Sequence, residues 1–283
     1  YYVISSNIIG GCKGSTGPSS LDPKTGRHYA LNFPNVTIED MIEAQKALID
    51  YLGVDKLLCV LGGSMGGMQT LQWVASYPDR VKSAIPIATA LKHSPQQIAF
   101  NEVGRQAVMA DPAWGSGNYY DNGEQPEKGL AVARMIGHIT YMSDRSMEDK
   151  FSRRLKEKKD DFRFTADFEV EGYLKYRGDS FVKRFDANSY LYITKAMDYF
   201  DLSGDGLFPD GKKVDVKFLV IAFKSDWLYP SYQSQEIARI LKIRGMDASY
   251  CEIESTYGHD AFLLELKEEG RLLKHFIDNV NGG

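Results

Sequence analysis

The segment LLCVLGGSMGGMQ at residues 57–69 constrains the fold more than any other part of this chain. It opens with an apolar run of strand length, and residues 65–75 have helical composition. Between them stands the pattern G-x-S-x-G, centred on Ser64. A passage from strand to helix this tight needs glycine, because glycine tolerates close backbone approach and unusual dihedral angles. The segment therefore predicts a strand, a sharp turn that carries Ser64, and a helix.

A turn of this kind has a chemical use. It lifts the Ser64 Oγ atom clear of the backbone and points the Met65 N–H toward any oxyanion that forms there. The string G-x-S-x-G also occurs by chance in glycine-rich loops. Here a strand precedes it and a helix follows it, which is the context that the catalytic motif requires. We therefore predict that Ser64 is a nucleophile and that Met65 supplies an oxyanion-binding N–H.

Length, composition and charge limit the class of protein. The 283 residues are 43% hydrophobic and 25% charged, which is typical of a globular protein with a large core. The net charge of −4 argues against a nucleic-acid binder, and no run approaches the ~18 apolar residues of a membrane span. The three widely spaced cysteines form neither a disulfide framework nor a metal-binding pattern, so we expect no metal site and a cytoplasmic location. We also expect no bound cofactor.

The order of predicted elements indicates an α/β fold. Strand-like apolar runs alternate with helical patterns, which implies a mostly parallel sheet with right-handed crossovers. We expect a core at residues 1–90 and 201–283, and a helical lid at residues 91–200. The predicted strands are residues 1–6, 57–61, 83–90, 216–223 and 248–253. The predicted helices are a helix capped by Thr37, then residues 65–75, 129–142, 189–200, 232–243 and 260–280, with an exposed charge run at residues 156–161.

A serine nucleophile needs a base, and the base needs an orienting carboxylate. His259 follows the last predicted strand and Asp226 follows the strand before it, so both lie at the carboxyl edge of the sheet. The chain order Ser64, Asp226, His259 is that of α/β hydrolases. Asp247 and Asp260 are alternative orienting acids. We predict that the other four histidines are helix or surface residues.

Beyond these residues, the chain resembles the homoserine O-acetyltransferases, which are α/β-hydrolase-fold enzymes of methionine biosynthesis. The matching stretches cover nearly the whole chain and are far more specific than G-x-S-x-G. They are GGC at residues 10–12, GSTGP at 14–18, FP at 33–34, VTI at 36–38, GGSMGGMQ at 62–69, GLAVARMIGHITY at 129–141, FDANSY at 185–190 and GHD at 258–260.

The resemblance implies a reaction. Acetyl-CoA, as co-substrate, acylates Ser64, and the hydroxyl of L-homoserine then takes the acetyl group, with His259 as base and Asp226 as its orienter. The resemblance also places Arg134 and Tyr141 of the lid, together with Asp260, around homoserine, and it implies a homodimer formed through the lid.

The substrate assignment agrees with the charges of homoserine. Arg134 can hold its carboxylate with two parallel hydrogen bonds, and Asp260 can pair with its ammonium group. Arg134 and Tyr141 are seven residues apart and so share one helix face. The alternative for Arg134 is a surface salt bridge, and the alternative for Tyr141 is a core position.

The chain departs from the family pattern at its start. Residues 1–6 have the composition of a buried strand, and a chain that opens within a strand is expected to be truncated. The family donates its first oxyanion N–H from an earlier loop, and loss of one such donor typically costs ~2.7–4 kcal/mol in the barrier. Activity of this fragment is therefore an open question.

Three other interpretations stay open from the sequence. Water could replace homoserine as acceptor, which would make the protein a serine esterase of the same fold. Succinyl-CoA or serine could be the substrate. A non-catalytic interaction module of the same fold is a third alternative, against which the intact Ser64, Asp226 and His259 argue.

Overall fold

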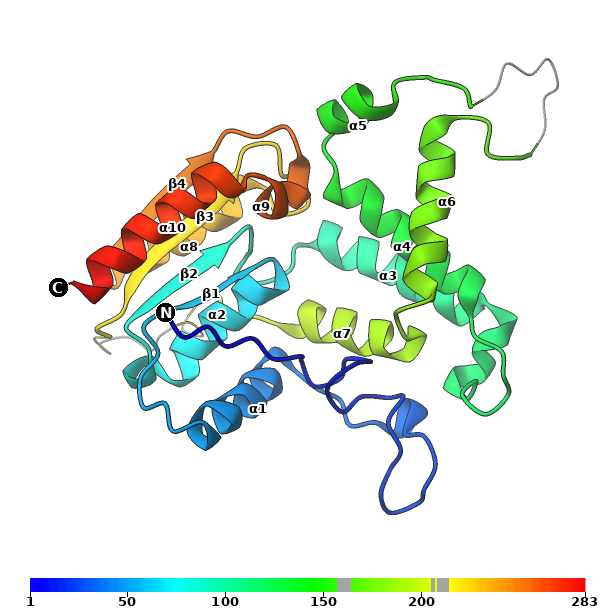
Figure 1. Ribbon diagram of the computed structural model, residues 1–283, viewed down its shortest axis with the longest axis horizontal. Helices are drawn as coiled ribbons and strands as arrows, with labels where there is room; N and C mark the ends of the chain where they lie inside the picture. The colour runs from blue at the N-terminus through cyan, green and yellow to red at the C-terminus, as the bar shows by residue number, and fades with distance from the viewer. Residues whose placement is uncertain (157–163, 205–206, 208–213, 283) are drawn as a thin grey trace.

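The computed structural model describes residues 1–156, 164–204, 207 and 214–282. A four-stranded parallel sheet, shown in Figure 1, has the strands in chain order. They are β1 (Val60–Gly63), β2 (Ser83–Ile87), β3 (Lys217–Phe223) and β4 (Ala248–Ile253). Because all three pairings are parallel, the carboxyl ends of the strands meet at one edge. The α/β-hydrolase fold class and its parallel sheet are confirmed.

The sheet is buried on both faces by helices. Alternate strand residues face opposite sides: Phe218 and Val220 join one cluster of buried residues, and Leu219 and Ile221 join another. The first cluster includes α1 (Ile38–Tyr51), α2 (Met65–Ser76) and α8 (Ser231–Ile243). The second packs against α10 (Leu266–Asn281) on the opposite face. Coverage on both faces explains why β3 is apolar along nearly its whole length.

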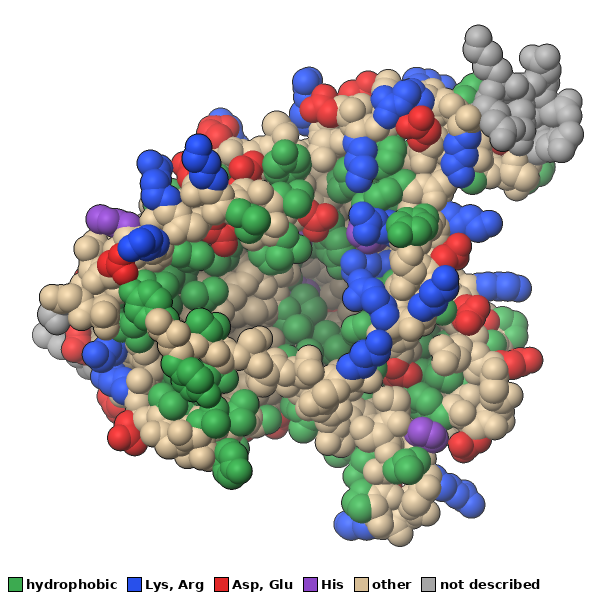
Figure 2. Space-filling model, in the orientation of Figure 1, with side chains coloured by type: hydrophobic (Ala, Val, Ile, Leu, Met, Phe, Trp, Pro, Cys, Tyr) green, Lys and Arg blue, Asp and Glu red, His purple; other side chains and the backbone are tan. Residues whose placement is uncertain are grey.

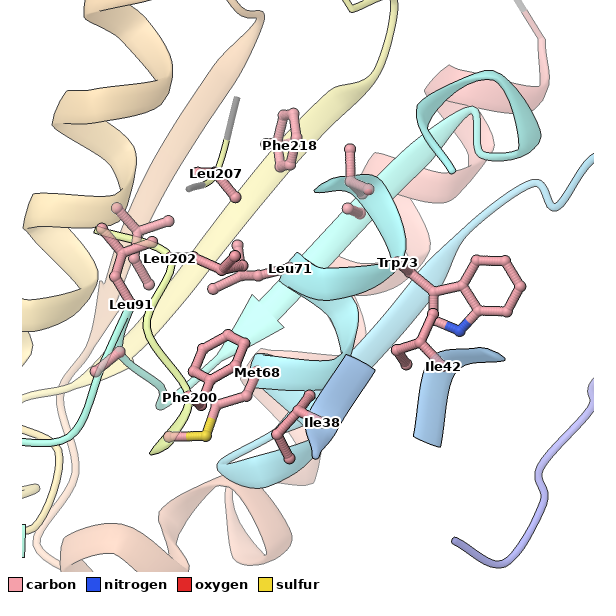
Figure 3. Packing of buried hydrophobic residues seen from close by; sticks show 14 of the residues in the cluster. Ile38, Ile42, Met68, Leu71, Trp73, Leu91, Phe200, Leu202, Leu207 and Phe218 are labelled. Carbon is pink, nitrogen blue, oxygen red and sulfur yellow. The ribbon is translucent and has the colours of Figure 1, made fainter. Parts of the chain in front are cut away.

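Helices α1 and α2 fix the position of the turn that carries Ser64. Thr37 caps α1 through a capping box with Asp40, as expected from the sequence. Met68 and Leu71 of α2 are fully buried, and Figure 3 shows them among the core side chains, with Ile38 of α1 close to Met68. The helix that begins after Ser64 is therefore held firmly against the sheet.

A block of helices lies between β2 and β3 in the chain. We call α3–α7 the helical block. In Figure 1 it occupies the side of the molecule away from α10. Its members are α3 (Pro95–Ala110), α4 (Glu127–Tyr141), α5 (Asp144–Phe151), α6 (Glu169–Val182) and α7 (Ala187–Tyr199). Helices α4 and α7 match predicted helices, whereas α3, α5 and α6 had not been predicted individually. The charge run at residues 156–161 lies outside the described residues except for Lys156.

Several predicted elements differ from the structure. Residues 1–6 do not form a strand: Tyr1, Tyr2 and Val3 are 77%, 78% and 84% exposed. A strand needs hydrogen-bonding partners, and no strand within the described ranges pairs with this segment. The strand predicted at residues 57–61 begins at Val60, and the one predicted at 83–90 ends at Ile87, because Ala88 has a φ of 46°.

The single terminal helix predicted at residues 260–280 is also wrong. The structure has a short 3₁₀ turn (Gly258–Asp260), a short helix α9 (Ala261–Leu264) and then α10. The break falls at Glu265, whose backbone angles (φ −83°, ψ 42°) are not helical. Within the described ranges, no helix is both long and apolar enough to cross a membrane.

Candidate active site

Ser64 occupies a strained turn between β1 and α2. Its backbone angles are φ 58° and ψ −119°, which a residue with a side chain rarely adopts. Two hydrogen bonds hold this conformation. The Ser64 N–H donates to the Ile87 carbonyl over 2.9 Å, and the Thr89 hydroxyl donates to the Ser64 carbonyl over 2.8 Å. Strain of this kind is common at functional sites, where the surrounding structure enforces it.

The glycines of the motif serve different purposes. A Cβ on Gly62 would lie 2.5 Å from the Gly66 carbonyl oxygen, and one on Gly67 would lie 2.5 Å from Thr89. Glycine is therefore required at these two positions by close packing. A Cβ on Gly66 would meet no atom within 4 Å. The expectation that both flanking glycines are sterically required is confirmed for Gly62 and wrong for Gly66.

The Met65 N–H lies at the first position of α2. Among the described residues it has no hydrogen-bond acceptor, as is usual for the first N–H groups of a helix. The positive end of the helix dipole adds to its ability to stabilise an anion. The group is therefore free to bind an oxyanion formed at Ser64, although that role stays a prediction.

His259 and Asp226 form a buried pair at the carboxyl edge of the sheet. His259 Nδ1 lies 2.7 Å from Asp226 Oδ2, and each residue is 3% exposed. The other carboxylate oxygen of Asp226 accepts backbone N–H bonds from Leu228 and Tyr229 at 3.0 and 2.8 Å. An acid that only accepts leaves the proton on His259 Nδ1, so Nε2 is free to act as a base. Of the three acids considered from the sequence, only Asp226 makes this contact in the described structure.

The hydroxyl of Tyr229 lies close to Ser64. Burial raises the pKa of Tyr229, and the neighbouring Ser64 hydroxyl works against that rise. Among the described residues, no hydrogen bond joins Ser64 Oγ to His259 Nε2. Bonds between a nucleophile and its base are often long without substrate and shorten in the reactive complex. The assignment of Ser64, Asp226 and His259 as a catalytic triad therefore stays a prediction, supported by their placement at one edge.

A cavity of about 210 Å³ opens at Ser64 and runs between the sheet and the helical block. Arg134 and Tyr141 line it, as the sequence predicts for two residues on one helix face. The Arg134 guanidinium lies 4.8 Å from the centre of the Phe181 ring and 5.4 Å from that of Tyr141. These two rings hold the guanidinium in the cavity without neutralising it.

Asp260 is not among the described residues that line the cavity. It follows His259 directly and is partly buried. Burial raises the pKa of its carboxyl, while the nearby His259 and Arg134 oppose that rise. Its electrostatic coupling to both shows that it belongs to the same neighbourhood, and its predicted contact with a substrate ammonium group remains untested.

The end of α4 is docked directly onto the catalytic loops. A Cβ on Gly258 would lie 2.5 Å from the Ser143 backbone nitrogen, so these two backbone segments lie so close together that only glycine fits at position 258. Trp227 Nε1 donates to the Met142 carbonyl over 2.8 Å, and the Ser143 hydroxyl donates to the Thr256 carbonyl. This docking brings the Tyr141 ring to 6.0 Å from the His259 ring.

Four cations of the helical block surround the buried His138: Arg134, Lys150, Arg177 and Arg184. Burial and then these charges lower the pKa of His138 to about 4. Within the described ranges, none of the four forms an ion pair with a carboxylate. Figure 2 shows Lys and Arg side chains gathered along the side of the central hollow that α4 and α6 form. This side of the hollow is therefore suited to an anionic ligand.

His93 and Tyr229 are site residues that the sequence analysis missed. His93 is 6% exposed, precedes α3 and lines the cavity, so its prediction as a helix or surface residue is wrong. A usable signal was present, because His93 follows the strand at β2 just as His259 follows β4. The four groups His93, Asp226, Tyr229 and His259 are all brought to the edge at which the parallel strands end. Among the described residues, no group of three or more His, Cys, Asp or Glu side chains could hold a metal ion.

The chain is similar to known proteins in both sequence and structure. The family model for the alpha/beta hydrolase fold matches residues 1–266. The curated homoserine O-acetyltransferase of Methanohalobium evestigatum is 61% identical over 99% of this chain and 58% of its own length. That of Solidesulfovibrio magneticus is 56% identical over 99% of this chain and 72% of its own length. The chain thus spans little more than half the length of several curated relatives that it matches.

Two solved structures are similar over most of the chain. A homoserine O-acetyltransferase from Bacillus anthracis has a TM-score of 0.85 and 29% identity, over 93% of this chain and 71% of that one. Esterase E22 has a TM-score of 0.83 and 27% identity, over 96% of this chain and 75% of that one. The shared fold therefore includes both an acyltransferase and an esterase by name.

Proposed function

The chain belongs to the homoserine O-acetyltransferase family of α/β-hydrolase-fold proteins, and from that premise we propose that it transfers an acetyl group from acetyl-CoA to L-homoserine. The observation that carries the proposal is the strained Ser64 turn at the same sheet edge as the buried His259–Asp226 pair. The product would be O-acetylhomoserine, and we propose that it is used in methionine biosynthesis.

The first half-reaction forms an acyl-enzyme. His259 Nε2 takes the Ser64 hydroxyl proton as Oγ attacks the thioester carbonyl carbon. The carbonyl oxygen becomes an oxyanion, to which the Met65 N–H donates. When the carbon–sulfur bond breaks, His259 returns the proton to the departing CoA thiolate. Acetyl-Ser64 remains, and CoA leaves as the thiol.

The second half-reaction transfers the acetyl group. His259 takes the proton of the homoserine hydroxyl, whose oxygen attacks acetyl-Ser64. The ester bond to Ser64 breaks, and the proton passes from His259 to Ser64 Oγ. Arg134 holds the carboxylate of homoserine, and Asp260 pairs with its ammonium group. The position of Arg134 in the cavity, without an anionic partner in the described structure, supports this clamp.

The cations of the helical block support a donor that carries phosphates. CoA is polyanionic, and Figure 2 shows Lys and Arg side chains along one side of the central hollow. Arg134, one of the cations around His138, lines the same cavity as Ser64. A simple ester would gain little from such a rim. We propose on this basis that the helical block is the lid of the enzyme, with residues 91–200 as the lid and residues 1–90 and 201–283 as the core.

An esterase is the second candidate function, because esterase E22 shares the fold at 27% identity. It would use the same acyl-Ser64, with water as acceptor. The charged clamp formed by Arg134 and Asp260 favours the transferase, because water needs no such groups.

The distinguishing experiment identifies products by mass. We would mix the purified protein with acetyl-CoA or succinyl-CoA, and with homoserine, serine or buffer alone as acceptor. O-acetylhomoserine as the main product supports the proposal, and free acetate at the same rate with and without homoserine would support the esterase. With a single nucleophile serving both substrates, initial-rate plots should give parallel lines. The cytoplasmic location and the homodimer stay predictions.

A further inference from the structure

Tyr229 lies against all three members of the proposed triad. Its hydroxyl is close enough to Ser64 for Ser64 to oppose the rise in its pKa, and its backbone N–H donates to Asp226 over 2.8 Å. Its ring stacks on that of His259, with centroids 5.0 Å apart and planes at 27°. Tyr229 is only 2% exposed, so its hydroxyl depends on protein partners.

A second partner of the Tyr229 hydroxyl comes from outside the triad. His93 Nε2 lies 2.7 Å from it, and His93 Nδ1 lies 2.9 Å from Asp198 Oδ1 on α7. Asn101 donates to the same oxygen over 2.7 Å, and Arg105 lies 2.7 Å from Asp198 Oδ2. A series of contacts therefore leads from α3 and α7 of the helical block to the nucleophile.

The charges along this series of contacts fix the direction of its hydrogen bonds. Burial would raise the pKa of Asp198, but hydrogen bonds from His93 and Asn101 and the ion pair with Arg105 lower it on balance. An ionised Asp198 only accepts, so the proton of a neutral His93 is on Nδ1 and Nε2 accepts from Tyr229. The Tyr229 proton is then held by His93, and only the lone pairs of the Tyr229 oxygen remain to face Ser64.

The residues that make up this series of contacts are buried, and burying their charges costs desolvation free energy. The side chains of Arg105 and Asp198 are 3% and 7% exposed, and that of His93 is 2% exposed. A buried ion pair is retained at a cost in desolvation, and fixing one arrangement is a known use of such groups. Gln97 makes a second contact between α3 and the loop that carries Tyr229, because its side-chain amide donates to the Leu228 carbonyl over 2.8 Å.

We propose that Asp198 and His93 are positioning residues that act through Tyr229, which orients Ser64 and supports His259 for acyl transfer. This inference rests on the proposed role of Ser64 as nucleophile. It gives the helical block a role besides enclosing substrates, because contacts from α3 and from His93 hold the loop that carries Leu228 and Tyr229. Asp198 and His93 form a second acid–histidine pair, which serves Tyr229 instead of Ser64.

The test measures the reactivity of Ser64 directly, with a fluorophosphonate that labels activated serines, and with acetyl-CoA. Tyr229→Phe keeps the ring and removes the hydroxyl. We expect both labelling and acylation of Ser64 to slow by about tenfold, equivalent to ~1.4 kcal/mol. Tyr119→Phe is the matched control: this buried tyrosine likewise loses a hydrogen-bonded hydroxyl, which donates to Asp186, and Ser64 of this variant should react at the normal rate.

Two His93 variants separate positioning from simple packing. His93→Asn places a polar group where Nδ1 stood and none at Tyr229, whereas His93→Gln reaches the Nε2 position. We expect His93→Asn to lose as much as Tyr229→Phe, and His93→Gln to recover part of the rate. Because His93 acts through Tyr229, the double variant with Tyr229→Phe and His93→Asn should be no slower than Tyr229→Phe alone.

The outcomes are distinct. An unchanged or faster reaction of Ser64 in Tyr229→Phe would overturn the positioning role, as would additive losses in the double variant. Failure of the proposed function looks different: fluorophosphonate would label another residue or none, or acetyl-CoA would leave Ser64 unacylated in the unmodified protein. Should His93→Asn fail to fold, the comparison of Tyr229→Phe with Tyr119→Phe decides the question alone.

Discussion

Two regions supply the candidate site, and they do so by different means. The sheet presents Ser64, Asp226 and His259 on loops that follow β1, β3 and β4, so backbone pairing determines where these side chains lie. The helical block presents Arg134 and Tyr141 from α4, whose position depends on side-chain packing and on docking at Gly258. In the proposed function the difference separates two tasks: the sheet would supply the groups that make and break bonds, and α4 would supply the groups that recognise homoserine.

The largest effect is expected on the sheet side. Asp226→Asn keeps the shape but offers His259 an amide, which favours the wrong tautomer of the ring. In serine enzymes such a change lowers turnover by about 10⁴-fold. We would measure acylation of Ser64 by acetyl-CoA, with Asp247→Asn as the control. A loss of less than tenfold in Asp226→Asn would show that this acid does not orient the base.

A smaller and more selective effect is expected in the helical block. A charge-assisted hydrogen bond is worth ~1.5–3 kcal/mol, so Arg134→Ala should lower efficiency toward homoserine by about one to two decades. Arg134→Lys should also be impaired, because lysine lacks the planar fork. The burst of CoA should stay nearly normal, since acylation does not involve the acceptor carboxylate.

Lys128→Ala provides the matched control for Arg134, because Lys128 is an exposed cation on the same helix. Its acceptor kinetics should be unchanged. Equal losses in the CoA burst and in acceptor efficiency of Arg134→Ala would mean that Arg134 stabilises the block, and its substrate role would then be withdrawn.

The smallest effect concerns stability of the helical block at acid pH. The pKa of His138 is lowered from 6.5 to about 4, so between these values the unfolded chain binds a proton that the folded chain does not. The free energy of unfolding should therefore fall as the pH drops, by about 1.4 kcal/mol at pH 5.5 from this residue. His138→Gln should show a smaller loss of stability between pH 7.5 and pH 5.5, measured by urea unfolding. An identical loss in both proteins would contradict the assignment.

The sequence predicts the sheet side well, because three residues each follow their own strand and parallel strands end at one edge. The same argument would also have predicted His93 as a site residue, because it follows β2, but only if the residues after every strand are considered. Residues 1–6 show that composition alone does not predict a strand, since an apolar run forms a strand only where another strand offers hydrogen-bonding partners. Tyr229 and Asp198 could not be predicted, because α3, α7 and the β3–α8 loop meet only through tertiary packing.

The central claim is that acetyl-CoA acylates Ser64 and that homoserine removes the acyl group. The most direct measurement is the mass of the protein after mixing with acetyl-CoA alone, followed by peptide mapping and then by addition of homoserine. We predict a gain of one acetyl group on the peptide that contains Ser64, absent in Ser64→Ala, and its release as O-acetylhomoserine. An acetyl group on a different residue, or an acetyl-Ser64 that homoserine leaves untouched, would contradict the account.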